Sequence, residues 1–118
     1  MVNYFSDTYG MIEVIKKDPS FARYFELPFT TTILNKIELY WWGLNYNSKE
    51  FADKIIKFEV EEITEEIISA AMILRKEHKK RNLSYADATG YAFAQKKGLL
   101  FLTGDRQFKD LAGVEFVQ

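Results

Sequence analysis

The chain has 118 residues, of which 47% are hydrophobic and 16% aromatic, so it can build a domain with a core and is not a disordered tail. A formal net charge of −1 excludes a strongly basic protein that wraps duplex nucleic acid, and the absence of cysteine excludes disulfides and thiolate metal sites. We expect a single domain over residues 1–118 in a reducing, cytoplasmic compartment. We expect no signal peptide in "MVNYFSD" and no membrane span, because no apolar stretch approaches roughly 20 residues.

The pattern of apolar, β-branched and turn residues predicts strands that alternate with helices. In chain order we expect a strand at residues 2–6, a helix at 7–17, a short helical stretch at 21–27, a strand at 29–32, helices at 33–46 and 48–57, a strand at 58–63, helices at 64–81 and 84–97, and strands at 99–103 and 114–117. Strands separated by helices form parallel β-α-β units. The apolar run from Leu99 to Leu102 is typical of a strand covered on both faces. The predicted fold class is therefore α/β, a three-layer α/β/α domain around a small parallel sheet.

Four acidic residues fall where such a sheet binds ligands. Open parallel sheets bind ligands beyond the carboxyl ends of their strands, where the strand order reverses. Asp7 follows the first strand and Asp105 follows the strand at 99–103, so the two face each other if these strands are neighbours. Glu38 lies about a turn and a half into the helix after the second strand, and Asp87 lies near the start of the helix at 84–97.

Each acid also has a purely structural explanation. Asp7 and Asp105 suit the N-cap position of a helix. Asp87 follows Ser84 by three residues in "SYAD", which is a capping-box pattern. Glu38 lies at the margin of an apolar helix face, where a glutamate is often simply solvated.

Together, however, four carboxylates at one rim indicate a site for a hard divalent cation. Crowded carboxylates repel one another, which raises some of their pKa values, and a bound cation removes the repulsion. Oxygen ligands, in a chain without cysteine and with a single histidine, favour Mg²⁺ or Mn²⁺ over Zn²⁺. Such ions activate a water molecule and stabilise the charge that develops in phosphodiester cleavage.

The ordered series of acids resembles the PIN-domain family, in particular the VapC-type toxins of toxin–antitoxin pairs. The matching stretches are "FSDTYGMIE", "TTTILNKIEL", "LSYADATGYAFAQKKG" and "LLFLTGD", and the resemblance covers essentially the whole chain. It implies a Mg²⁺- or Mn²⁺-dependent endoribonuclease with strand order 3-2-1-4-5, an RNA substrate and a cognate antitoxin. It also implies acidic catalytic and metal-site residues, with hydroxyl residues beside them: Asp7, Glu38, Asp87 and Asp105, and then Thr103 and Thr8.

The chain departs from the family pattern at two positions beside the acids. Tyr9 stands where the family often has serine, and Gly104 stands where a larger polar residue is common. Neither departure removes an acid, but a tyrosine at position 9 would narrow the cleft and alter the choice of substrate.

The helix at 33–46 carries two apolar stripes. The stripe that we expect to face the core consists of Ile33, Ile37, Tyr40, Trp41 and Leu44, and Asn35 is expected to point away from it. The second stripe is the candidate surface for an antitoxin or for the second copy in a homodimer: Leu39, Trp42 and Tyr46. The alternative is that the helix at 48–57 covers it.

Several basic residues are candidate RNA contacts. The candidates for phosphate binding are Lys96, Lys97, Arg106 and Lys109. The run "RKEHKKR" at 75–81 is either a solvated helix end or a flank that contacts phosphate. We expect His78 to be a buried or edge histidine rather than a catalytic one.

Other functions compete with that of a toxin ribonuclease. The chain could be a PIN-like RNA-processing nuclease outside a toxin–antitoxin pair. It could also be a non-catalytic PIN-like scaffold, although a scaffold has no need of crowded carboxylates. A phospho-acceptor domain of the response-regulator type also clusters aspartates at a sheet rim, but the positions of Glu38 and Asp87 do not fit it.

Overall fold

The computed structural model describes residues 3–46 and 58–118, and within them a five-stranded parallel sheet has the order β3-β2-β1-β4-β5. The strands are β1 (Tyr4–Ser6), β2 (Phe29–Thr32), β3 (Glu59–Glu61), β4 (Leu100–Thr103) and β5 (Val114–Phe116). The predicted strand order is confirmed. Strands β2 and β3 lie on one side of β1, and β4 and β5 lie on its other side, so the strand order reverses between β1 and β4. At such a switch point a crevice forms at the carboxyl ends of the two strands.

The helices lie between the strands much as the sequence predicts. They are α1 (Thr8–Ile15), α2 (Ile33–Tyr46), α4 (Glu65–Glu77) and α5 (Tyr85–Lys97), with short 3₁₀ helices η1 (Pro19–Tyr24), η2 (Lys79–Arg81) and η3 (Arg106–Phe108). The helix expected at 48–57 lies outside the described residues. Within the described part of the chain, no helix combines the length and the hydrophobicity needed to cross a bilayer.

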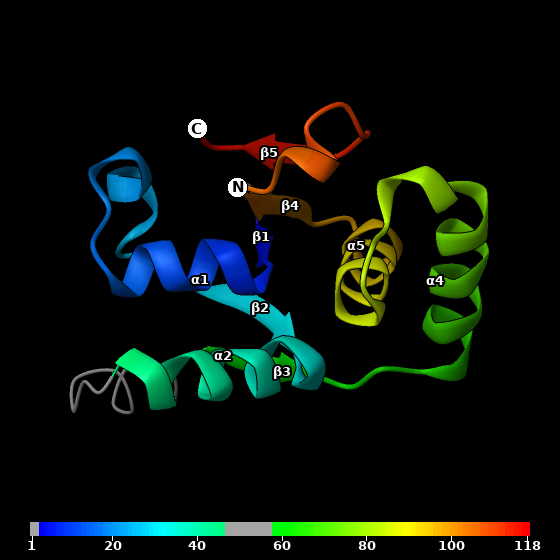
Figure 1. Cartoon of the computed structure of the whole chain (residues 1–118), viewed down its shortest axis with the longest axis horizontal. Coiled ribbons are helices and arrows are strands. Elements are labelled where there is room, and N and C mark those ends of the chain that lie inside the picture. Colours follow the sequence, from blue (N-terminus) through cyan, green and yellow to red (C-terminus); the bar gives the residue numbers. More distant parts are fainter. Residues whose placement is uncertain (1–2, 47–57) are drawn as a thin grey trace.

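Helices cover both faces of the sheet, with α1, η1 and α2 on one side and α4 and α5 on the other (Figure 1). Side chains along a strand alternate between the two faces. Tyr4 and Leu102 join a core cluster with α1, η1 and α2. Phe5 and Phe101 join the cluster of α4 and α5, and their stacked rings lie 5.5 Å apart between centroids. The predicted three-layer α/β/α architecture is therefore confirmed.

The rotation of α2 about its axis differs from the prediction. Leu39 is only 1% exposed and belongs to the core, and Asn35 is buried although we expected it to point away. Conversely, the stripe expected to face the core is exposed: Ile33, Ile37, Tyr40, Trp41 and Leu44. A buried asparagine is tolerated here because the Asn35 side chain bonds to Thr32 and Thr8. We call the exposed stripe the outer face of α2.

Candidate active site

The four acids that the sequence singles out line one pocket of about 550 Å³. Asp7 directly follows β1, Asp105 follows β4 by two residues, Glu38 lies in the second turn of α2, and Asp87 lies in the first turn of α5. Four separate elements thus bring their carboxylates to the crevice between β1 and β4. The other lining residues are Thr8, Tyr9, Ile12, Ile37 and Trp41.

Asp7 is the buried acid of this group, with an exposed fraction of 3%. Its Oδ1 accepts a hydrogen bond from the Gly10 amide at 2.7 Å, and its Oδ2 accepts one from the Thr103 hydroxyl at 2.5 Å. The pKa of Asp7 is raised to about 7, and burial is the largest cause. The negative charges of Asp87 and Asp105 also raise this pKa, whereas the hydrogen bonds from Thr103 and Gly10 partly offset the increase. Asp7 therefore sits where a negative charge is unfavourable unless a cation accompanies it.

Asp105 is held by the turn that follows β4. Its amide donates to the Thr103 hydroxyl at 2.9 Å, and its Oδ1 accepts from the Gln107 amide at 3.0 Å, so that Asp105 caps η3. Thr103 thus contacts two of the four acids. The family resemblance implies a hydroxyl residue beside the acids, and Thr103 lies in that position.

Glu38 is oriented through a chain of polar side chains. The Thr8 hydroxyl donates to Oε1 of Glu38 at 2.5 Å, and Nδ2 of Asn35 donates to the Thr8 oxygen at 3.3 Å. The Thr32 hydroxyl in turn donates to Oδ1 of Asn35 at 2.7 Å. Sequence reasoning missed Asn35. The signal that could have found it is the Thr-x-x-Asn spacing, in which Thr32 also accepts from the Asn35 amide, as an N-cap does.

Asp87 forms the capping box that the sequence offers as its structural explanation. Its Oδ2 accepts from the Ser84 amide at 3.0 Å, and its own amide donates to the Ser84 hydroxyl at 3.0 Å. Burial raises the pKa of Asp87, the bonds to Ser84 lower it, and the charge of Asp105 raises it further. Asp7 and Asp105 are N-caps, Asp87 is the N3 partner in a capping box, and all three line the pocket. A carboxylate has about four lone-pair sites, so capping leaves oxygen lone pairs available for a ligand.

The donor set of the pocket fits a hard divalent cation. The lining residues offer four carboxylates and no histidine, which matches the ligand preference of Mg²⁺ or Mn²⁺. Within residues 3–46 and 58–118, no three acidic or histidine side chains already lie close enough together to hold a metal ion, so binding would draw the carboxylates together. A cation among them would also relieve the repulsion that Asp87 and Asp105 exert on Asp7.

The candidate RNA contacts lie outside the residues that line the pocket. Lys96 pairs with Glu66 at 2.9 Å, and Lys97 lies over the Phe93 ring, 5.9 Å from its centroid. Lys109 lies 5.7 Å from the centroid of the Phe116 ring, and Arg106 is exposed in η3, next to Asp105. Their contact with phosphate remains a prediction.

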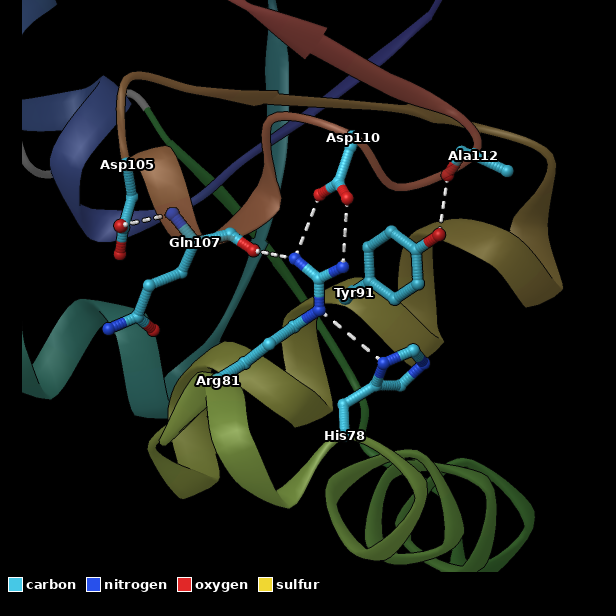
Figure 2. Close-up of polar contacts among 7 residues, drawn as sticks. All are labelled: His78, Arg81, Tyr91, Asp105, Gln107, Asp110 and Ala112. Carbon is cyan, nitrogen blue, oxygen red and sulfur yellow. Dashed lines mark hydrogen bonds and ion pairs between the residues drawn. The ribbon is translucent and has the colours of Figure 1, made fainter.

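Arg81, from the basic run at 75–81, supports the loop that carries Asp105. Figure 2 shows its guanidinium between the loop and the histidine at the end of α4. It donates to the Gln107 carbonyl at 2.6 Å, makes two bonds to the Asp110 carboxylate at 2.9 and 3.2 Å, and donates from Nε to Nδ1 of His78 at 3.4 Å. Gln107 bonds to Asp105, so Arg81 positions this acid indirectly. The sequence offered two explanations for this basic run, a solvated helix end or a contact to phosphate. The observed contacts of Arg81 are instead with the loop that carries Asp105. The half-buried His78 matches the expected edge position.

The stripe predicted as a partner surface is not an exposed surface. Leu39 is a core residue, and Trp42 is half-buried against the same cluster. Tyr46 is exposed, but its ring stacks on Trp42 with 4.5 Å between centroids. The apolar surface that α2 presents is its outer face, and Ile37 and Trp41 belong both to that face and to the pocket.

Comparison with solved structures relates the whole fold to toxin–antitoxin proteins. A toxin–antitoxin complex from Klebsiella pneumoniae contains a chain with a TM-score of 0.77 and 20% identity, covering 96% of each chain. Mycobacterium tuberculosis VapC20, described as a Sarcin–Ricin loop cleaving toxin, gives a TM-score of 0.74 and 19% identity over 98% of this chain and 100% of that one. A chain of VapBC2 from Rickettsia felis, bound to a DNA fragment from its promoter, gives a TM-score of 0.74 and 18% identity over 100% of this chain and 100% of that one. At these identities the likeness establishes a shared fold.

The sequence itself is recognised by a family model. No curated protein matches the chain. The model of the PIN domain, in contrast, matches residues 11–114, and so covers β2 to β4 and three of the four acids. This protein therefore belongs to the PIN-domain family.

Proposed function

We propose that this protein is a Mg²⁺- or Mn²⁺-dependent endoribonuclease, and that it is the toxin of a toxin–antitoxin pair. The observation that carries the proposal is the convergence of four carboxylates, from four separate elements, on one pocket at the β1/β4 crevice. An arrangement that raises the pKa of a buried Asp7 to about 7 is unfavourable for a protein that never binds a cation there. The description of VapC20 as a Sarcin–Ricin loop cleaving toxin supports the choice of an RNA substrate for this protein.

In this proposal the four acids hold a cation, and neighbouring polar groups hold the acids. Asp7, Glu38, Asp87 and Asp105 hold the divalent cation, which when bound supplies a Lewis acid for water activation and charge stabilisation. Thr103 and the Gly10 amide fix the two oxygens of Asp7, whereas Thr8 orients Glu38. These bonds fix the starting orientations of the Asp7 and Glu38 carboxylates before a cation draws the acids together.

The proposal includes an antitoxin-type protein partner on the outer face of α2. Two of the structurally similar proteins are described as toxin–antitoxin assemblies. Exposed Ile37 and Trp41 join this face to the pocket, so a partner seated on it would also cover the acids and exclude RNA. A homodimer through the same face is the alternative occupant.

The test is cleavage of a mixed RNA pool by the purified protein in Mg²⁺, in Mn²⁺ and in chelator. We expect cleavage only with a divalent cation, and its loss in Asp7→Asn and Asp105→Asn with the fold intact by circular dichroism. Asp110→Asn is the matched control, because Asp110 lies in the same loop as Asp105 but does not line the pocket. RNA binding without cleavage would favour a non-catalytic PIN-like scaffold. Cleavage in chelator at the same rate as in Mg²⁺ or Mn²⁺ would exclude a metal-dependent enzyme.

A further inference from the structure

Tyr9 and Gly104 pack against each other beside the acids. Tyr9 follows Asp7 by two residues at the start of α1, and Gly104 immediately precedes Asp105. A Cβ atom built at position 104 would lie 2.3 Å from Cε1 of the Tyr9 ring, 2.9 Å from Cδ1 and 3.0 Å from Cζ. The ring therefore occupies the space that a side chain at position 104 would fill. The two departures from the family pattern are one structural feature.

The backbone at Gly104 does not itself require glycine. Its φ lies outside the left-handed region, whereas Gly98 and Gly113 have φ of +68° and +74°. An alanine at position 104 would meet no backbone strain, and the three atoms nearest to its Cβ would all belong to the Tyr9 ring. What glycine provides at this position is room for that ring.

Packed in this way, the Tyr9 side chain still presents a free surface to the pocket. It is 47% exposed and lines the pocket together with Asp7, Asp105 and the exposed ring of Trp41. Among the described residues, the Tyr9 hydroxyl has no hydrogen-bond partner, so the side chain is not fixed by a polar network of its own. Its position depends on the fit against Gly104.

Building on the proposed ribonuclease activity, we propose that the Tyr9 ring is a stacking platform for an unpaired RNA base next to the cleaved phosphodiester, and that Gly104 positions it. Proteins read single-stranded RNA largely by stacking splayed bases on aromatic rings. A phosphodiester that reaches the acids lies beside Tyr9. Asp7 precedes Tyr9 by two residues, and Asp105 follows Gly104, which packs against the Tyr9 ring. A protein partner on the outer face of α2 would cover the same pocket, so contact of Tyr9 with such a partner is the outcome that the test distinguishes from stacking on RNA.

The test uses a single-stranded RNA oligonucleotide that the wild type cuts in the mixed-pool assay. Loss of one stacking contact weakens binding by about tenfold. We therefore expect Tyr9→Ala to raise KM by about tenfold with a smaller change in kcat, and Tyr9→Phe to match the wild type. Gly104→Ala should raise KM in the same way, and Tyr9→Ala/Gly104→Ala should be no worse than Tyr9→Ala. Tyr85→Ala is the matched control, because Tyr85 is an exposed tyrosine that belongs neither to the pocket nor to the outer face of α2.

A second readout is a series of oligonucleotides in which one base at a time is replaced by an abasic site. At one position beside the cut, the abasic site should raise the KM of the wild type by about tenfold but should not raise the KM of Tyr9→Ala any further. A tyrosine with a merely structural role would not show this coupling. If the wild type cuts RNA but Tyr9→Ala keeps the same KM and the same abasic profile, the stacking proposal is wrong and the ribonuclease proposal stands. If Tyr9→Ala weakens only the binding of a protein partner, the ring is a protein contact and the proposal is again wrong. If the wild type cuts no RNA with Mg²⁺ or Mn²⁺, both proposals fail.

Discussion

The Thr103 hydroxyl donates a hydrogen bond of 2.5 Å to Oδ2 of Asp7 and so joins the carboxyl end of β4 to the residue that follows β1. The same oxygen accepts the Asp105 amide at 2.9 Å. Thr103 is buried, so neither contact is exchanged easily for water. One hydroxyl thereby fixes two carboxylates of the candidate site.

Replacing this hydroxyl by a methyl group should damage both stability and activity. Thr103→Val leaves the buried Asp7 oxygen and the Asp105 amide without their partner, which should lower the free energy of unfolding by about 1–3 kcal/mol. RNA cleavage should fall as well, because both acids lose their orientation. Thr103→Ser keeps the hydroxyl and should retain most of both properties. Denaturant unfolding and RNA cleavage assays check this prediction, and a fully active Thr103→Val would remove Thr103 from the account.

The pKa of Asp7 predicts how the stability of the metal-free protein depends on pH. In the folded state this pKa is about 7, against an ordinary value of 3.8. Between these values the native protein binds a proton that the unfolded chain does not, so the free energy of unfolding falls as pH rises from about 4 to about 7. The difference between these two pKa values corresponds to about 4 kcal/mol in the free energy of unfolding.

The Asp7 contribution is isolated by comparison with Asp7→Asn in chelator. Asparagine does not titrate, so the difference in stability between variant and wild type should widen in favour of the variant between pH 5 and pH 8. Denaturant unfolding at the two pH values gives this difference. A difference that does not change with pH would show that Asp7 titrates normally in the folded protein.

The sequence predicted the sheet and its acidic rim because both follow from local patterns. Apolar runs such as Leu99 to Leu102 mark strands buried on both faces, and the alternation of strands with helices dictates a parallel sheet. Since Asp7 and Asp105 lie within two residues of the ends of their strands, their placement required only the strand order. That order came from the family resemblance, not from the pattern of the residues.

The rotation of α2 could not be predicted in the same way. A helical wheel ranks faces by hydrophobicity, and the outer face of α2 is the more apolar one. The helix nevertheless buries Asn35, because Thr32 and Thr8 satisfy its side chain, and it buries Gly43 alongside Leu39. Those partners come from β2 and α1, so only the tertiary structure reveals them.

Arg81 is expected to support catalysis without touching the pocket. Arg81→Ala removes the bonds to the Gln107 carbonyl and to Asp110, which should loosen η3 and displace Asp105. We expect RNA cleavage to fall by about tenfold, since small misplacements of a catalytic group have effects of at least that size. Asp110→Ala keeps the bond to Gln107 and should stay close to wild type. Equal activities of Arg81→Ala and wild type would contradict the positioning role.

The outer face of α2 predicts which substitutions separate partner binding from folding. Tyr40→Ser with Leu44→Ser changes two exposed residues that do not line the pocket, and Leu44 is 78% exposed. The double variant should fold normally and lose affinity for an antitoxin-type protein partner, or lose self-association. Leu39→Ala is the contrasting control and should lower the free energy of unfolding by about 2–5 kcal/mol, because it opens a cavity in the core. Sedimentation and thermal unfolding distinguish these outcomes, and unchanged association in Tyr40→Ser/Leu44→Ser would place the partner surface elsewhere.

The most direct test of the acid-lined pocket as a cation site is the melting temperature at pH 8 in chelator and in saturating Mg²⁺. A ligand at about 100 times its Kd adds about 2.7 kcal/mol to the free energy of unfolding, so the wild type should melt at a clearly higher temperature with Mg²⁺. Asp87→Asn can still accept the Ser84 amide and should melt near the wild type in chelator, yet gain much less from Mg²⁺. Asp110→Asn should gain as much as the wild type. A wild-type melting temperature that is the same in chelator, Mg²⁺ and Mn²⁺ would contradict the metal-dependent site.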